Sequence, residues 1–395
     1  MRSPRVAPAV AALVMVMLIV FAAGRTDAHK PITSPYTFSD DVLPIVEAKC
    51  GACHRSGGVA PMSLLTHREA VPWGASMKVE LMAGHMPPWR VQGPATRFRN
   101  VPMLSARELN VLLTWASGGT PPGSAEKAPA PPSSGWALGV PDVVLDMPEP
   151  FTLAADRQEG VAEFTLAVPA GLTRLRAADL APGTPSMVRQ ATISVAMEPA
   201  GIGGVPVERT LALWLPGDPP VRLDNGLGFD VPAGARLRVV IRYKKTWEHA
   251  RETLTDRSRI GLYRATPDTA IVRALTLSPR TATALADGTV SASFETKEPL
   301  RALALYAGAA MPEAQLIVTA VRPDGSRETL IDFRPRNGWE RRYWFSTPMT
   351  LPRGTRLTLD ASPGARPLLP PGAVTTSTSF DASRVRLTLN VAAVP

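Results

Sequence analysis

Cys50, Cys53 and His54 are the residues whose types and spacing indicate chemistry. They form Cys50-Gly-Ala-Cys53-His54, the C-x-x-C-H pattern of covalent haem attachment. Each thiol is expected to form a thioether bond to a haem vinyl group, and His54 is expected to bind the iron. A thioredoxin-like dithiol would instead follow a strand and open a helix, whereas a helical pattern precedes this motif. The sequence therefore predicts one haem c.

A second axial ligand would have to come from the residues that follow the motif. The candidates by residue type are Met62, Met77, Met82, Met86, Met103, His67 and His85. Met86 precedes Pro87-Pro88-Trp89, and two prolines hold a chain extended and rigid enough to fix a sulfur. We therefore place Met86 on the iron. His85 is the main competitor, and a second histidine ligand would lower the reduction potential.

Composition narrows the class of protein. A chain of 395 residues has room for two or three domains, and its 41 prolines and 30 glycines favour short strands and turns. The haem would use both cysteines, which leaves none for a disulfide. The net charge of +9 is spread along the chain without a dense basic run, which excludes nucleic acid as a partner class. A basic surface would instead attract an acidic redox partner.

The N-terminus has the pattern of a secretory signal. Arg2 and Arg5 precede an apolar run over residues 7–23, and small residues allow cleavage after Ala22 or Ala28. The run is shorter than the about 20 residues that a membrane span needs. We assign residues 1–28 to a signal peptide and expect a periplasmic or otherwise exported protein. Membrane association is expected only if this segment stays uncleaved.

Periodicity predicts a multidomain chain. A small all-α domain over residues 29–120 has helices starting near Asp41, over 72–83, and after a Ser105/Glu108 capping box. Residues 121–135 form a proline-rich linker. Short apolar runs separated by Gly, Pro and Asp then indicate antiparallel β-sandwiches. Two sandwich domains are expected, over 136–265 and 266–395.

Several motifs carry a resemblance to a known group. Cys50-Gly-Ala-Cys53-His54, Gly58-Val-Ala-Pro-Met-Ser-Leu-Leu65 and Gly84-His-Met-Pro-Pro-Trp89 resemble the monohaem cytochrome c domain of certain exported bacterial proteins. In that group the haem domain precedes a region similar to copper type II, ascorbate-dependent monooxygenases such as peptidylglycine α-hydroxylating monooxygenase. Trp214-Leu-Pro-Gly217 is among the matching β-segments. The resemblance implies two jelly-roll-like domains and supports Met86 as the distal ligand.

The β-region departs from that group at its copper ligands. Imidazole is the usual copper ligand, yet His249 is the one histidine beyond residue 135. Positions that carry histidines in the group fall here at Arg189, Gln190 and Arg242. We therefore expect a c-type cytochrome that transfers single electrons and holds no copper. Two further hypotheses stay open: a haem-fed, copper-dependent monooxygenase-like oxidoreductase, and a β-region that binds a ligand or partner.

Overall fold

The computed structural model describes residues 33–94, 96–124, 136–196, 208–224, 226–277, 283–284, 289–308, 314–363 and 385–394. Of the described residues, 42% lie in strands and 14% in helices, so the chain is mostly β. None of the described helices is long and apolar enough to cross a membrane. The predicted signal peptide and most of the predicted linker lie outside the described residues.

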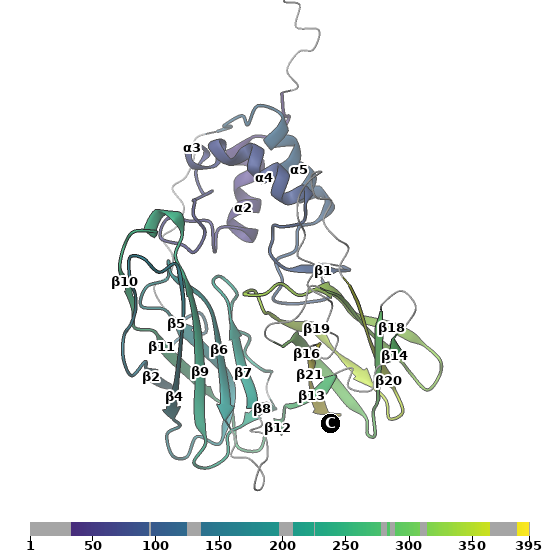
Figure 1. Ribbon diagram of the computed structural model, residues 1–395. Helices are drawn as coiled ribbons and strands as arrows, with labels where there is room; N and C mark the ends of the chain where they lie inside the picture. The colour runs from purple at the N-terminus through teal and green to yellow at the C-terminus, as the bar shows by residue number, and fades with distance from the viewer. Residues whose placement is uncertain are drawn as a thin grey trace, which may run out of the picture.

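The helices gather at one end of the molecule, above the sheets (Figure 1). They are η1 (Phe38–Val42), α2 (Leu43–Lys49), α3 (His67–Ala70), η2 (Val71–Trp73), α4 (Gly74–Met82) and α5 (Ala106–Ser117). Their apolar faces meet around fully buried Trp115, which packs beside Phe38. The capping box is present: Ser105 Oγ accepts from the Glu108 amide, and Glu108 Oε2 accepts from the Ser105 amide. We call this part of the chain the helical cap.

The first β unit packs two sheets face to face. One sheet has the order β12-β8-β5-β11-β2, and the other has the order β4-β9-β6-β7. The strands are β2 (Val143–Asp146), β4 (Glu159–Ala167), β5 (Arg174–Ala181), β6 (Val188–Ala196), β7 (Glu208–Trp214), β8 (Leu227–Asp230), β9 (Arg236–Lys244), β11 (Arg259–Arg264) and β12 (Ala270–Ile271). Alternation places Leu237, Val239 and Ile241 of β9 in the core, as a strand with one buried face requires. A short pair, β3 (Phe151–Leu153) with β10 (Leu254–Asp256), and the single turn η3 (Trp247–His249) complete this unit.

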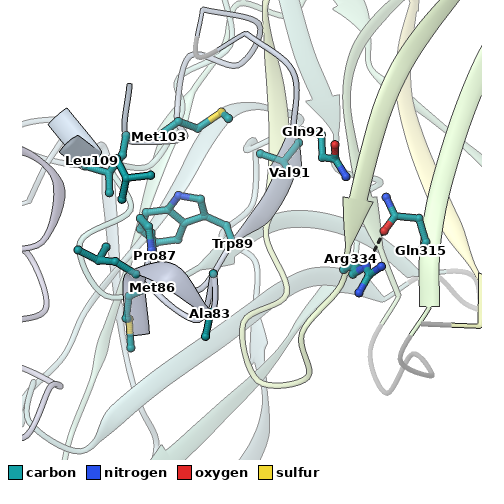
Figure 2. Close-up of a pocket in the computed structure, with 13 residues that line it drawn as sticks. Ala83, Met86, Pro87, Trp89, Val91, Gln92, Met103, Leu109, Gln315 and Arg334 are labelled. Carbon is teal, nitrogen blue, oxygen red and sulfur yellow. Dashed lines mark hydrogen bonds between the residues drawn. The ribbon is translucent and has the colours of Figure 1, made fainter. Parts of the chain in front are cut away.

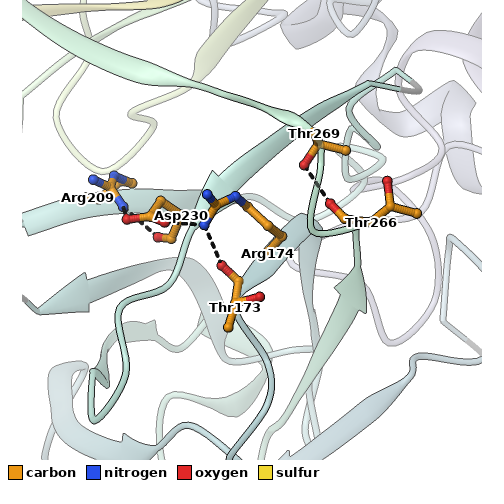
Figure 3. A network of polar contacts seen from close by, with 6 residues as sticks. All are labelled: Thr173, Arg174, Arg209, Asp230, Thr266 and Thr269. Atoms are coloured by element: carbon orange, nitrogen blue, oxygen red, sulfur yellow. Dashed lines mark hydrogen bonds and ion pairs between the residues drawn. The ribbon is translucent and has the colours of Figure 1, made fainter.

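A partly buried acid connects the two sheets of this unit. Asp230, at the end of β8, forms ion pairs with Arg174 of β5 and with Arg209 of β7 (Figure 3). The two arginines come from different sheets. One carboxylate therefore pairs with a cation from each layer, and it fixes how the two sheet edges meet.

The second β unit also packs two antiparallel sheets. Their orders are β1-β18-β17-β20-β15-β14 and β13-β21-β16-β19. The strands are β1 (Arg90–Gln92), β13 (Arg273–Leu277), β14 (Thr283–Ala284), β15 (Val290–Glu295), β16 (Leu300–Ala307), β17 (Ala314–Val321), β18 (Arg327–Arg334), β19 (Arg342–Leu351), β20 (Arg356–Pro363) and β21 (Leu387–Ala393). Leu316, Val318 and Leu389 are fully buried between the sheets. The larger sheets of the two β units together have a propeller-like arrangement.

The predicted fold class, a small all-α cytochrome c domain followed by two jelly-roll-like sandwiches, is wrong. Residues 29–120 form no separate all-α domain, because β1 pairs with β18 in the six-stranded sheet. Val91, Phe98 and Val101 lie in the core of the second β unit, not in the core of the helical cap. The chain leaves the cap after Met86, contributes to this β-core, and returns to form α5. Helical periodicity could not show this, because a three-residue strand has no detectable period.

Replacing Phe98 with alanine tests this assignment. Phe98 is 3% exposed and its ring lies 5.5 Å from the ring of Phe345 and 5.4 Å from that of Tyr343. Loss of a buried phenylalanine costs about 3–5 kcal/mol. We expect Phe98→Ala to lower urea stability and to speed hydrogen exchange in β19, whose Tyr343 and Phe345 contact the ring. Phe38→Ala, in the helical-cap core, is the control and should speed exchange in α5 instead. Faster exchange confined to the helical cap in Phe98→Ala would contradict the assignment.

Candidate functional site

The Cys50–His54 segment lies at the C-terminal end of α2. Backbone bonds from the Cys53 and His54 amides to the Cys50 carbonyl, at 3.0 and 2.9 Å, close a compact turn. This turn holds both thiols and the imidazole in one short loop. The loop faces the first β unit, where Cys53 Sγ lies 3.4 Å from the carbonyl oxygen of Pro216.

The loop has a close fit to the turn after β7. Gly217 adopts a φ of +71°, a conformation that favours glycine. A Cβ built at Gly217 would lie 2.1 Å from the Cβ of Ala52. Only glycine therefore lets the Trp214–Gly217 turn approach the residues between the two cysteines. The Trp214-Leu-Pro-Gly217 sequence thus has a packing role against the cysteine loop.

Burial makes the loop side chains uncharged at neutral pH. Burial raises the pKa of Cys50 to about 12 and also raises the pKa of Cys53, which Arg341 and Arg189 partly oppose. Burial lowers the pKa of His54, so its imidazole is neutral. Its Nδ1 atom is buried without a partner among the described residues. Thiols this weakly acidic form little thiolate, which disfavours rapid thiol–disulfide exchange.

Three parts of the chain meet beside this loop at a buried ion pair. Arg341, next to β19, lies 3.0 Å from Asp218, which follows β7, and their side chains are 2% and 6% exposed. Arg341 also donates to the carbonyl of Asn100, from the segment that links the helical cap to the β-core. Its guanidinium lies 4.2 Å from the ring centre of Trp89. Burial raises the pKa of Asp218 to about 6. One cation thus contacts the first β unit, the second β unit and the 89–100 segment.

The predicted haem c is corrected here, and so is the electron-transfer function built on it. The fold offers no separate haem-binding helical domain, because residues 90–101 belong to the second β unit. Within the described ranges, no group of three or more His, Cys, Asp or Glu residues could hold a metal ion. The predicted membership of the monohaem cytochrome group and the predicted haem iron are therefore wrong.

The sequence-predicted ligands fall into different surroundings. Cys50, Cys53 and His54 share the loop, whereas Met86 lines a cavity after α4. Of the two histidine candidates for the distal position, His67 is 2.8 Å from the Thr120 carbonyl, and His85 pairs with Glu80. The four methionine candidates besides Met86 are dispersed: Met62 and Met77 pack against the helical-cap core, Met82 is 68% exposed, and Met103 borders the second core.

The described residues at the group's histidine positions have separate surroundings. Gln190 lies buried in β6 and donates to the Glu340 carbonyl, and Arg242 lies in β9. Burial lowers the pKa of Arg189 to about 10. His249 lies in η3, where its Nδ1 is 2.9 Å from Glu252.

A cavity of about 490 Å³ lies between the helical cap and the six-stranded sheet. Its wall on the side of the cap is apolar and contains Met86, Pro87, Trp89, Met103 and Leu109 (Figure 2). Methionine side chains adapt their shape to what they contact, and Trp89 offers a large flat surface. The volume falls within the range of small-molecule sites, about 300–1,000 Å³. Sequence reasoning missed this cavity.

The opposite wall is polar and comes from the outer face of the sheet. Leu316 of β17 and Phe333 of β18 are paired and point into the core, so Gln315 and Arg334 point to the other face. Gln315 Oε1 accepts from Arg334 Nε at 2.5 Å, and Gln315 Nε2 donates to Asp332. Figure 2 shows this Gln315–Arg334 pair across from Trp89 and Met86. A cavity with one apolar and one polar wall can hold and orient an amphiphilic molecule.

Comparisons with known proteins assign no family. No protein-family model matches the chain, and no curated protein matches it. One similar solved structure is a xanthan lyase from Paenibacillus, with 11% identity over 70% of this chain, 28% of that chain and a TM-score of 0.18. Another is the CBM22-1–CBM22-2 tandem domain from Paenibacillus barcinonensis Xyn10C, with 12% identity, 62% and 82% coverage, and a TM-score of 0.15. The chain spans less than a third of the lyase, and similarities this weak establish neither fold nor function.

The Arg341–Asp218 pair gives a test of how the parts are joined. Asp218→Ala leaves Arg341 charged and buried, which costs about 3–5 kcal/mol. The free energy of urea unfolding should be measured well above the pKa of Asp218. Burial raises the pKa of Asp218 in the folded state, so the folded protein favours the protonated carboxyl. The free energy of unfolding of the wild-type protein should therefore fall as the pH rises through about 6.

A double-mutant cycle separates the pair from its surroundings. Because Arg341→Met removes the charge that Asp218→Ala would leave unpaired, the double variant should lose clearly less stability than the sum of the single losses. Strict additivity of the two losses would show that the pair does not join the β units.

Proposed function

We propose that the chain is a binding protein whose β-region, together with the helical cap, binds a small molecule. The cavity between Trp89 and Arg334 carries this proposal. It combines an apolar wall with a few polar groups, which is the usual composition of a ligand site. It lies where the chain runs from the cap into the second β unit, so a ligand there would contact both.

The arrangement favours binding over catalysis. Among the described residues that line the cavity, none is a histidine, cysteine, serine, aspartate or glutamate. A general acid or base needs a titratable group within reach of the substrate. The guanidinium of Arg334 offers hydrogen-bond donors only and serves to bind and orient.

A neutral fluorogenic probe tests the site. N-phenyl-1-naphthylamine is apolar and fluoresces when it leaves water. We expect it to bind one site per chain with micromolar affinity, because apolar contact with Trp89, Met86 and Met103 removes it from water. The measurement is fluorescence titration of the full-length protein, with stoichiometry from titration at high protein concentration.

A matched pair of variants locates the probe. Ala83 lines the cavity, whereas Ala75 is exposed on α4 away from it. Ala83→Trp should fill the cavity and weaken binding at least about tenfold, a loss of about 1.4 kcal/mol. Ala75→Trp adds the same side chain to the cap and should change nothing. Absence of binding, or equal binding by both variants, would rule out this site.

We also propose that the chain is exported and that Cys50 and Cys53 attach a covalent group. Support comes from the apolar run over residues 7–23 and from the compact turn that holds both thiols in one short loop. Intact-mass spectrometry of the protein secreted by a bacterial host tests both points. We expect a cleaved N-terminus and a mass above that of the remaining polypeptide.

Substitution of the cysteines provides the control for this measurement. The excess mass should be absent from Cys50→Ala/Cys53→Ala and present in Ala52→Ser, which leaves both thiols in place. A wild-type mass equal to that of the bare polypeptide would exclude covalent attachment.

A further inference from the structure

We propose that the ligand of the cavity carries an anionic head group, which Arg334 binds while the apolar wall holds the rest of the molecule. This inference rests on the proposed function and names the chemical class of its ligand. A carboxylate, sulfonate or phosphate would each satisfy it, since all present oxygen acceptors to a guanidinium.

The charge of the cavity supports an anion. Arg334 is the one charged side chain among the described residues that line it. On the neighbouring strand β17 its hydrogen-bond partner is Gln315, an amide that carries no charge. The chain also carries a net charge of +9, which favours the approach of anions.

Arg334 is held in place without being neutralised. Gln315 accepts from its Nε, and Gln315 in turn donates to Asp332, so an amide separates the guanidinium from that carboxylate. Within the described part of the chain, Nε is the only side-chain nitrogen of Arg334 with a hydrogen-bond partner. The terminal nitrogens thus keep their donors, and Gln315 acts as a positioning residue. Orientation by a bound amide reduces the entropy that Arg334 loses when a ligand arrives.

Trp89 supplies the flat surface of the apolar wall. It lines the cavity, and Arg341 lies over its ring at 4.2 Å, which holds the indole in place. The apolar part of the ligand would pack on this ring while its head group meets Arg334.

Two dyes that differ by one anionic group test the inference. 8-Anilinonaphthalene-1-sulfonate is N-phenyl-1-naphthylamine with an added sulfonate. We expect the wild-type protein to bind the sulfonated dye at least about tenfold more tightly, which is the effect of about 1.4 kcal/mol. Arg334→Gln should abolish that preference and leave the affinity for the neutral dye unchanged. Gln315→Leu should reduce the preference in part, because the charge remains but its orientation is lost.

The control variant is Arg327→Gln, at the exposed start of the same strand. It removes one positive charge from the protein and should keep the preference. Equal affinity for the two dyes, or a preference that survives Arg334→Gln, would overturn the inference of an anionic head group. Either result would leave the proposed binding function in place. Failure of both dyes to bind would overturn the proposed function and this inference with it.

Discussion

The buried contact between Arg341 and Asp218 is the constraint on which the arrangement of the parts depends. Each β unit has an apolar core, and the core of the first unit also includes Leu303, Ala304, Trp344 and Ala392 of the second. Apolar packing of this kind has little directional preference. An ion pair that is 2% and 6% exposed has a strict requirement, because either partner left alone would be a buried charge. Arg341 also donates to the Asn100 carbonyl and lies over the face of Trp89, so these two residues must keep their places beside the ion pair. The two β units and the segment below the helical cap therefore have one favourable relative position.

That position creates the cavity. Trp89 has one face against Arg341 and also lines the cavity, so the residue that fixes the junction forms part of the apolar wall. The polar wall follows from strand register, since burial of Phe333 forces Arg334 to the opposite face of β18. Neither wall is complete without the other. Binding at this place would stabilise the junction, because a ligand that needs both walls favours the state in which they face each other.

The sequence predicted what is encoded locally. The Ser105/Glu108 capping box identifies the start of α5 from residues three apart, and alternating burial identifies strands such as β9. The sequence did not predict the contacts between residues that lie far apart along the chain. Val91 and Phe98 were assigned to a helical domain because they lie between helices in the chain, yet they pack in the second β-core.

The cavity shows the same limit. It joins Trp89 to Gln315 and Arg334, which are far away along the chain, and no local pattern signals that contact. The C-x-x-C-H pattern marked a loop at the junction, but a pattern of three residues does not determine the fold around it. The position of that loop nevertheless gives a physical reason why the junction and the cavity should respond together. Cys53 lies against Pro216, Gly217 packs on Ala52, and Asp218 is the next residue along the chain. A change in the bulk of the loop would move the turn that carries Asp218, and with it the partner of Arg341. Arg341 contacts Trp89, so such a movement would alter the apolar wall of the cavity. Coupling of this kind needs only contacts between neighbouring side chains, because close-packed residues cannot shift independently.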